Sequence, residues 1–346
     1  MKLGISLGYS GARYDVPVEL VQKAEALGYD SVWTAEAYGS DAMTPLAYLA
    51  AKTERIKLCT GIIQLAARTP ANAAMQAGTI DAMAGGGRVV IGIGVSGPQI
   101  VEGWYGERWG SPYYRMKDYV TIMRKIFKRE APVTHDGREI ALPYPAEDAT
   151  GLGKPLKSIL HMNPDIPLVL ATGQEASVRL TGEIADGWMP HGFMPGTMSE
   201  FQPWLEEGFA RAGNGKSMEG FEIYAMVPVE LDDDVQAALD RQKPEIALYV
   251  GGMGHRSKNF HALQMGRRGF ADEAARIQEL YLGGHKTEAA AAVPDEYVDM
   301  RSLSGPPERI RERYQAWADS GATSLILRQP DVPTLELMAE IALSSS

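Results

Sequence analysis

Hydrophobic residues follow two alternating patterns along this chain. Short runs rich in β-branched residues alternate with longer segments whose hydrophobic residues recur at helical spacing. This alternation is typical of a parallel sheet whose strands are joined by helices. Eight runs have the length and composition of strands, namely Leu3–Leu7, Ser31–Thr34, Ile56–Ile63, Val89–Gly94, Leu168–Ala171, Gly187–Pro190, Glu222–Glu230 and Ser324–Leu327. Because eight is the strand number of a (β/α)8 barrel, the pattern predicts a TIM barrel.

The helical segments near the two ends of the chain have similar boundaries. Pro17–Leu27 has helical spacing and is followed by Gly28, a residue suited to the left-handed backbone that ends many helices. Near the C-terminus, Pro306 and Pro307 open a segment that ends before Gly321, and the last strand follows. The repeated order of helix, glycine and strand favours a sheet that closes on itself.

Two segments interrupt this rhythm. Residues 132–167 contain a polar turn and many prolines, and residues 247–304 contain the glycine-rich, basic stretch Gly251–Lys258. Insertions at the C-terminal rim of a barrel commonly shape the active site. We therefore predict one domain, residues 1–346, with both insertions at that rim.

Composition and charge narrow the function. The net charge is −10, so the chain has no broad basic field for nucleic acid or an anionic membrane. No run approaches the ~18 apolar residues of a membrane span, and the chain opens on a strand pattern instead of a signal peptide. The single cysteine, Cys59, lies in a hydrophobic run and is expected to be buried and unreactive. We expect a cytoplasmic enzyme that acts on small molecules.

Two loops at strand ends have the composition of phosphate-binding turns. Gly92–Gly97 matches the G-x-G-x-x-G pattern, but it follows the fourth strand and the helix after it is broken by Gly103, which disfavours a dinucleotide fold. Ser96 and Gly97 still present amides and a hydroxyl at the rim. The second loop, Thr172-Gly173-Gln174, precedes a helix and is interpreted either as a phosphate cradle or as an ordinary helix N-cap by Thr172.

The histidines do not suggest a metal centre. None of the six has the spacing of a metal-binding pair, so no metal site is predicted. His191 directly follows the sixth strand, which places it at the predicted barrel mouth. It is interpreted either as a site residue or as an ordinary surface histidine.

Several segments together resemble the bacterial luciferase-like flavin and deazaflavin oxidoreductases. The resemblance covers nearly the whole chain, and the stretch Val95–Trp104 is most similar to the branch that uses coenzyme F420, a deazaflavin, in place of FMN. The other segments that carry it are Ser31–Glu36, Asp41–Ala47, Thr53–Ile62, Arg68–Pro70, Thr79–Asp81, Gly86–Arg88, Ala185–Trp188 and Ser304–Glu308.

The resemblance implies a site as well as a fold. It implies a (β/α)8 barrel, with the cofactor ring in the C-terminal mouth against a bulge of the third strand that contains a non-prolyl cis peptide. By position this bulge is Thr60-Gly61-Ile62, with the cis bond between Gly61 and Ile62. The cofactor phosphate would be bound by Ser96 and Gly97 and by the Thr172-Gly173-Gln174 loop. The resemblance also implies a homodimer that pairs through early helices.

The chain departs from the family pattern at two positions. Many relatives have a histidine after the acidic residue that follows strand two, whereas this chain has Glu36-Ala37, and a methyl group cannot transfer a proton. Sugar-phosphate dehydrogenases of this branch have a catalytic glutamate where this chain has Pro98, which argues against sugar-phosphate oxidation. The candidate proton-transferring residues are Tyr38, Glu102 and His191, and Glu36 is a candidate both for catalysis and for contact with the cofactor ring.

These observations lead to one preferred function and two alternatives. The preferred function is an F420-dependent oxidoreductase that transfers a hydride between C5 of the deazaflavin and a small organic substrate. The first alternative is an FMN-dependent monooxygenase that works with a separate flavin reductase. The second is a protein that binds the cofactor without turnover, a hypothesis prompted by Ala37 and Pro98.

Overall fold

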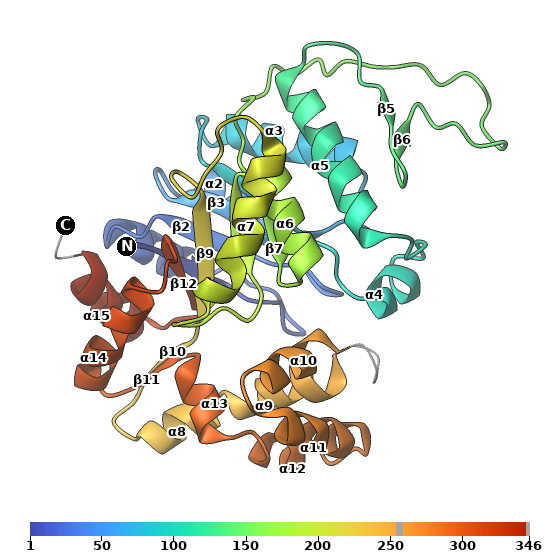
Figure 1. Ribbon diagram of the computed structural model, residues 1–346. Helices are drawn as coiled ribbons and strands as arrows, with labels where there is room; N and C mark the ends of the chain where they lie inside the picture. The colour runs from blue at the N-terminus through green and yellow to red at the C-terminus, as the bar shows by residue number, and fades with distance from the viewer. Residues whose placement is uncertain (254–258, 344–346) are drawn as a thin grey trace.

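A closed barrel of parallel strands forms the centre of the computed structural model, which describes residues 1–253 and 259–343 (Figure 1). Around the barrel the strand order is β1-β12-β9-β8-β7-β4-β3-β2. The strands are β1 (Lys2–Ser6), β2 (Ser31–Thr34), β3 (Lys57–Gln64), β4 (Val89–Gly94), β7 (Leu168–Thr172), β8 (Gly187–Pro190), β9 (Glu222–Val227) and β12 (Ser324–Arg328). The predicted TIM barrel is confirmed, and its strands agree with the predicted runs to within a few residues.

Alternation along the strands separates two apolar clusters. Residues such as Leu3 and Ile5 of β1 point outward and pack under the surrounding helices. Side chains of the opposite parity fill the barrel interior, and this interior cluster consists of Trp33, Cys59, Val90, Val169, Met189, Tyr224 and Ile326. Cys59 is fully buried there, as expected from its hydrophobic surroundings in the sequence.

The helices that cover the barrel begin and end where the sequence signals indicate. Helix α1 (Val18–Ala26) follows Pro17, and Gly28 after it has φ +92°, a conformation that glycine adopts without strain. The other covering helices are α2 (Met43–Ala50), α3 (Pro70–Met83), α5 (Pro112–Lys128), α6 (Glu175–Ile184), α7 (Met198–Ala212), α14 (Pro307–Ala318) and α15 (Val332–Leu343). A short helix, α4 (Pro98–Gly103), lies between β4 and α5.

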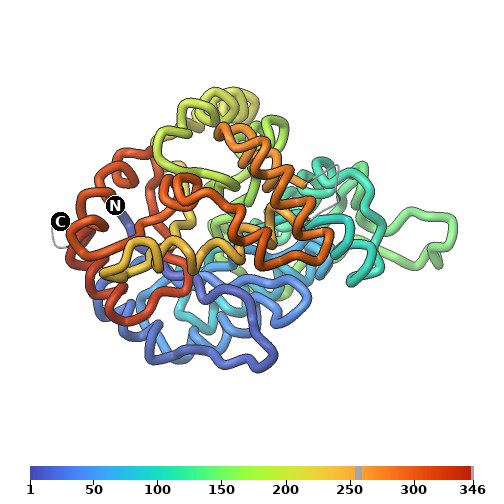
Figure 2. Tube along the Cα trace, turned by 90° about the horizontal axis from the view of Figure 1, so that it is seen from below, coloured from blue at the N-terminus to red at the C-terminus, as the bar shows by residue number. Residues whose placement is uncertain are grey.

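The segment 132–167 lies at the opposite end of the barrel from the position predicted for it. It joins the end of α5 to the start of β7, so chain direction places it at the N-terminal ends of the strands. It contains the small hairpin of β5 (His135–Asp136) and β6 (Ala141–Leu142) and projects from the body in both Figure 1 and Figure 2. The predicted position at the C-terminal rim was therefore wrong. Composition shows that the segment is irregular, but it does not show whether the segment leads from a helix to a strand or from a strand to a helix.

The second insertion does lie at the C-terminal end of the barrel. Strand β9 stops before Pro228, which lacks a backbone donor, and β10 (Val229–Leu231) pairs with β11 (Leu303–Gly305) outside the barrel. Between them are α8 (Val235–Asp240), α9 (Lys243–Ala247), η1 (Leu248–Gly252), α10 (Phe260–Arg267), α11 (Ala271–Leu282), α12 (Lys286–Ala291) and α13 (Asp295–Met300). Figure 2 shows these helices lying across that end of the barrel.

The helical insertion has an apolar cluster of its own. Leu239, Ile246, Met265, Ile277 and Val298 are buried together within it. Because residues of α8 and α9 contribute to this cluster, the insertion starts near residue 235, earlier than the predicted 247. Part of the glycine-rich stretch, residues 254–258 with the basic Arg256 and Lys258, lies outside the described residues.

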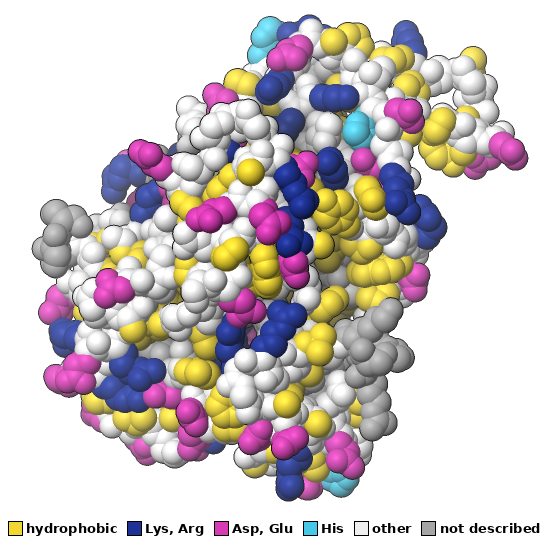
Figure 3. Space-filling view, viewed as in Figure 1, with side chains coloured by type: hydrophobic (Ala, Val, Ile, Leu, Met, Phe, Trp, Pro, Cys, Tyr) yellow, Lys and Arg dark blue, Asp and Glu magenta, His cyan; other side chains and the backbone are white. Residues whose placement is uncertain are grey.

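The surface and the helix lengths add two observations. Acidic and basic side chains are interspersed over the face shown in Figure 3, and hydrophobic side chains appear on the projecting 132–167 segment. Among the described residues, the helices are all too short or too polar to cross a membrane.

Candidate active site

Glu36 lies just beyond the end of β2, and both of its carboxylate oxygens accept hydrogen bonds from other residues of the protein. Its Oε1 accepts hydrogen bonds from the Gln64 backbone N–H (2.7 Å) and from Arg68 Nη1 (2.8 Å). Its Oε2 accepts from the Ala42 N–H (3.1 Å) and from Arg68 Nη2 (2.7 Å). A buried carboxyl group that accepts four hydrogen bonds, two of them from one guanidinium, is held firmly in place. In the structure Glu36 therefore anchors the loop after β2, and its roles in catalysis and in contact with the cofactor ring stay predictions.

The third strand is irregular where the bulge was expected. The register between β3 and β4 shifts between Thr60 and Ile63, and the Gly61–Ile62 peptide bond is cis. The Thr60 hydroxyl is fully buried and donates to the Gly92 carbonyl (2.9 Å), so this side chain belongs to the barrel wall. Gly61 and Ile62 are partly exposed. The bulge thus presents backbone and a small aliphatic surface above the interior cluster.

Gln64, the last residue of β3, has one unsatisfied atom. Its Nε2 donates to the Glu36 carbonyl (2.9 Å), while its buried Oε1 has no hydrogen-bond partner among the described residues. A buried amide oxygen without a donor is costly and rare in proteins. This atom marks a position where a ligand N–H would find an acceptor.

The loops after β4 and β7 form the other part of the mouth. Ser96 has φ +59°, in the left-handed region, and Gly97 precedes α4. Helix α6 starts after Gln174, whose N–H donates to the Ser177 hydroxyl (3.3 Å). The first backbone N–H groups of such a helix have no acceptor inside the helix and favour an anion.

Thr172 does not contribute its side chain to this loop. Its hydroxyl is buried against Thr181 (2.8 Å), and Gln174 instead of Thr172 precedes the helix. The N-cap role considered for Thr172 is therefore wrong, and its contact with the cofactor phosphate stays a prediction. Gly173 packs closely on the loop after β8, since a Cβ there would lie 2.9 Å from the His191 carbonyl oxygen.

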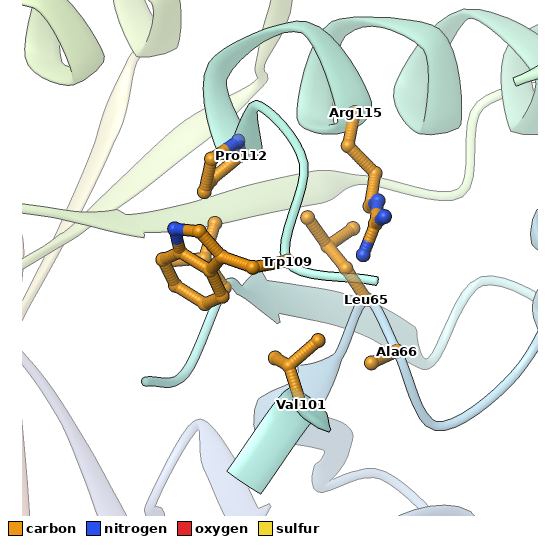
Figure 4. Close-up of a pocket in the computed structure, with 7 residues that line it drawn as sticks. Leu65, Ala66, Val101, Trp109, Pro112 and Arg115 are labelled. Atoms are coloured by element: carbon orange, nitrogen blue, oxygen red, sulfur yellow. The ribbon is translucent and has the colours of Figure 1, made fainter. Parts of the chain in front are cut away.

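A small pocket adjoins the loop after β4 (Figure 4). Arg115 extends from α5 toward Leu65 and Ala66 at the end of β3, and the Trp109 ring lies on the other side of Leu65. The complete lining is Leu65, Ala66, Val95, Val101, Trp109, Pro112 and Arg115. The pocket is thus apolar apart from one guanidinium group.

His191 is paired with a histidine from the helical insertion. His191 follows β8, and its Nε2 lies 3.2 Å from Nδ1 of His261 on α10. Gln264, one turn further along α10, donates from Nε2 to the His191 carbonyl (2.6 Å). The Tyr249 ring packs on His261, with 4.7 Å between ring centroids, and Tyr9 is a neighbour of the Tyr249 phenol. The barrel and the insertion therefore meet at this pair.

Both imidazoles are held in the neutral form. Burial, assisted by the charge of Arg301, lowers the pKa of His191 to about 4. Burial, His191 and Arg301 lower the pKa of His261 well below its ordinary value. Burial and the neighbouring Tyr9 raise the pKa of the Tyr249 phenol. Near neutral pH both rings are uncharged, and the N–H of one imidazole donates to the lone pair of the other.

The other two candidate proton donors lie on the outer rim. Tyr38 is 60% exposed, and its ring centroid is 6.5 Å from that of Trp104. Glu102 is exposed on α4. The structure brings neither of them into the network around Glu36 or into the histidine pair.

Sequence reasoning missed three of the residues that define this site. Gln64 ends a predicted strand and could have been found by the same argument that selected His191. His261 and Tyr249 had no such signal. Asn259 caps α10 through hydrogen bonds from His261 N and Ala262 N, which predicts a helix start, but no local pattern indicates contact with a residue 70 positions earlier.

Taken together, these features define an α/β-barrel protein whose candidate site lies at the C-terminal ends of the strands. Among the described residues, no group of three or more His, Cys, Asp or Glu side chains could hold a metal ion. The mouth instead offers an orphaned amide oxygen, a bulged strand, two amide-bearing loops and a neutral histidine pair.

The chain belongs to the luciferase-like monooxygenase family, whose model matches residues 2–324. It is 45% identical over 329 residues, 94% of each chain, to a Mycobacterium tuberculosis protein provisionally named a coenzyme F420-dependent oxidoreductase. It is 28% identical to the 5,10-methylenetetrahydromethanopterin reductase of Archaeoglobus fulgidus, covering 96% of this chain and 95% of the relative.

A solved structure extends this comparison to the fold. The coenzyme F420-dependent tetrahydromethanopterin reductase from Methanopyrus kandleri matches with a TM-score of 0.80 at 22% identity, covering 99% of each chain. At this identity the match shows a shared barrel architecture.

Proposed function

We propose that this protein is a coenzyme F420-dependent oxidoreductase that transfers a hydride between the deazaflavin and a small organic substrate. The observation that carries the proposal is the 45% identity, over nearly the full length, to a relative named for F420-dependent oxidoreduction. The geometry of the mouth supports it, because a bulged strand, a buried amide oxygen without a partner and two amide-bearing loops lie at the C-terminal ends of the strands.

The residues present fit a deazaflavin. Gly61 and Ile62 offer a bare, slightly apolar surface against which a flat ring can lie. The buried Oε1 of Gln64 supplies the acceptor that a ring N–H requires. Ser96, Gly97 and the start of α6 after Gln174 would hold the phosphate through backbone N–H groups and a hydroxyl.

Substrate chemistry needs the protein for orientation, water exclusion and proton transfer. Bound F420 would supply or accept the hydride at C5. The Glu36–Arg68 pair fixes the loop after β2 beside the end of β3. With Ala37 at the position where relatives have a histidine, His191 is our first choice for proton transfer. The exposed Tyr38 and Glu102 are secondary candidates.

Equilibrium titration of the purified protein with F420 and with FMN tests the cofactor. We expect F420 to bind and FMN to bind far more weakly. The variant Ser96→Arg should abolish F420 binding by filling the loop after β4. Tight FMN binding without F420 binding would favour a luciferase-like monooxygenase that needs a flavin reductase and would overturn our proposal.

Turnover is tested separately from binding. Oxidation of reduced F420 with a panel of enones, ketones and aldehydes, and reduction of F420 with alcohols, should reveal a substrate. Binding without any turnover would favour a cofactor-binding protein, the role prompted by Ala37 and Pro98. The proposal includes a cytoplasmic location and a homodimer, and light scattering of the pure protein would measure the second of these.

A further inference from the structure

The His191–His261 contact joins two parts of the fold that are far apart in sequence. His191 is fixed at the end of β8, with its carbonyl bound by Gln264, and His261 is fixed by the Asn259 cap at the start of α10. Their ring nitrogens are 3.2 Å apart, and the ring planes are inclined at 75°. Both side chains are only partly exposed. This is a held pair within hydrogen-bonding distance at the mouth of the barrel.

The neutral state of the pair determines what it can do. A neutral imidazole has one N–H and one lone pair. The mutual hydrogen bond uses one N–H and one lone pair, which leaves one outward N–H on one ring and one outward lone pair on the other. Reversing the mutual bond exchanges these two ends. The pair can therefore take up a proton at one end and release one at the other without acquiring charge.

We propose that His191 and His261 form a neutral proton relay that serves the oxygen of a carbonyl or alcohol substrate, with His191 facing the substrate and His261 facing solvent. This rests on the proposed function, which supplies the hydride. The relay takes the place of the histidine that is absent at Ala37. The Tyr249 ring packs on His261, and the neighbouring Tyr9 is 53% exposed.

The proton transfer balances in both directions. When a carbonyl is reduced, bound F420 would supply the hydride to its carbon, and the carbonyl oxygen takes the proton from His191 Nδ1. The proton on His261 Nδ1 moves to His191 Nε2, and water returns a proton to His261 Nε2. Each ring ends neutral with its proton on the other nitrogen. Alcohol oxidation runs the same sequence backward.

A neutral relay also agrees with the charges around it. Arg301 and burial oppose an imidazolium at either ring, and Glu245 and Arg328 pair with each other beside Tyr249. A neutral imidazole can still act as the hydrogen-bond donor to a carbonyl oxygen, as it does in other enzymes. The arrangement favours substrates whose protons are exchanged on oxygen.

Nitrogen-detected NMR of histidine side chains tests the pair without turnover. We expect His191 and His261 to stay neutral from pH 5.5 to 8. His285, which lies on the exposed surface beside Glu288, is the reference histidine for the assignment. In His191→Gln the pKa of His261 should rise, because His191 is one of the groups that lower it. Wild-type His191 or His261 titrating near 6.5 would overturn the relay.

Kinetics then test the function of the pair. With reduced F420 and acetone, cyclohexanone or benzaldehyde, His191→Gln and His261→Gln should each lose about 100-fold or more in kcat, the usual range for acid–base groups. Glutamine keeps a hydrogen bond but cannot relay a proton, so F420 affinity should be unchanged. The matched control His285→Gln should keep the wild-type rate.

The outcomes separate the relay from the proposed function. If the wild type does not bind F420, the proposed function fails and the relay fails with it. If the wild type reduces carbonyls and His261→Gln keeps its rate, the relay alone is wrong. If F420 binds but every carbonyl in the panel is inert while an alkene without a carbonyl is reduced, the substrate class is wrong.

Discussion

The Glu36 carboxylate and the Arg68 guanidinium form a bidentate ion pair, with 2.8 Å between Oε1 and Nη1 and 2.7 Å between Oε2 and Nη2. The pair is buried, with side-chain exposures of 3% and 10%. The same carboxylate binds backbone N–H groups of Ala42 and Gln64. One acidic residue thus links the loop after β2, the end of β3 and the loop before α3.

Removing the cation should be more damaging than removing both charges. Arg68→Met leaves a buried carboxylate without its partner, and such changes typically cost about 3–5 kcal/mol. The double variant Glu36→Gln/Arg68→Met should recover part of this loss. Urea unfolding followed by circular dichroism measures both. As a control, Lys23→Met breaks an exposed pair with Glu336 and should change stability by less than about 1 kcal/mol.

Ser96 should tolerate glycine better than a β-branched residue. Its φ of +59° lies in the left-handed region, which costs most L-residues about 1–2 kcal/mol. We expect Ser96→Gly to leave the free energy of unfolding nearly unchanged and Ser96→Val to lower it by about that amount. Equal unfolding midpoints for the two variants would contradict a left-handed residue at this position.

Gly61 should be sensitive to any side chain because of its neighbours. A Cβ at Gly61 would lie 3.1 Å from Trp33 Cε3 and 3.1 Å from Met189 Cε, closer than most real contacts. Gly61→Val should lower stability by about 1–3 kcal/mol through overpacking and weaken F420 binding, and Gly61→Ala should do less. At Gly103 a Cβ would meet no atom within 4 Å, so Gly103→Ala is the matched control. F420 titration measures cofactor binding and thermal unfolding measures stability for the wild type and these three variants.

The low pKa of His191 predicts a loss of stability in mild acid. The folded protein holds this histidine neutral down to a pKa of about 4, whereas the unfolded chain takes up the proton near 6.5. Between these values the unfolded state binds more protons, so the free energy of unfolding falls as the pH is lowered, by at most about 1.4 kcal/mol per pH unit. His191→Gln should flatten this part of the profile. Denaturant titrations from pH 7 to 4 provide the test, and parallel profiles for the two proteins would refute it.

Much of the fold could be predicted because it is encoded locally. Ser31–Thr34 and Gly187–Pro190 were predicted with the bounds that the structure gives them, since short buried strands between helices carry a clear hydrophobic signal. Residues 132–167 show the limit of that signal. Composition identifies an irregular segment. Its place at the N-terminal or the C-terminal end of the barrel depends on whether a helix or a strand precedes it.

The site was less predictable because its contacts are long-range. Loop composition selected Ser96 and Gln174 as candidates, and the structure places them in the loops after β4 and β7. The Thr172 hydroxyl was assigned to the mouth, yet it is buried against Thr181, because the direction of a side chain depends on strand twist and packing. The partner of His191 could not be found at all without the fold.

The separate apolar cluster of the helical insertion has a thermal consequence. A unit with its own core can open with a smaller free energy than the closed barrel, which has no free edge. His191 belongs to the barrel and His261 to the insertion, so their contact exists only while the two are docked. On heating, the protein should therefore lose this contact while its barrel remains intact, and inactivation should precede the main loss of secondary structure.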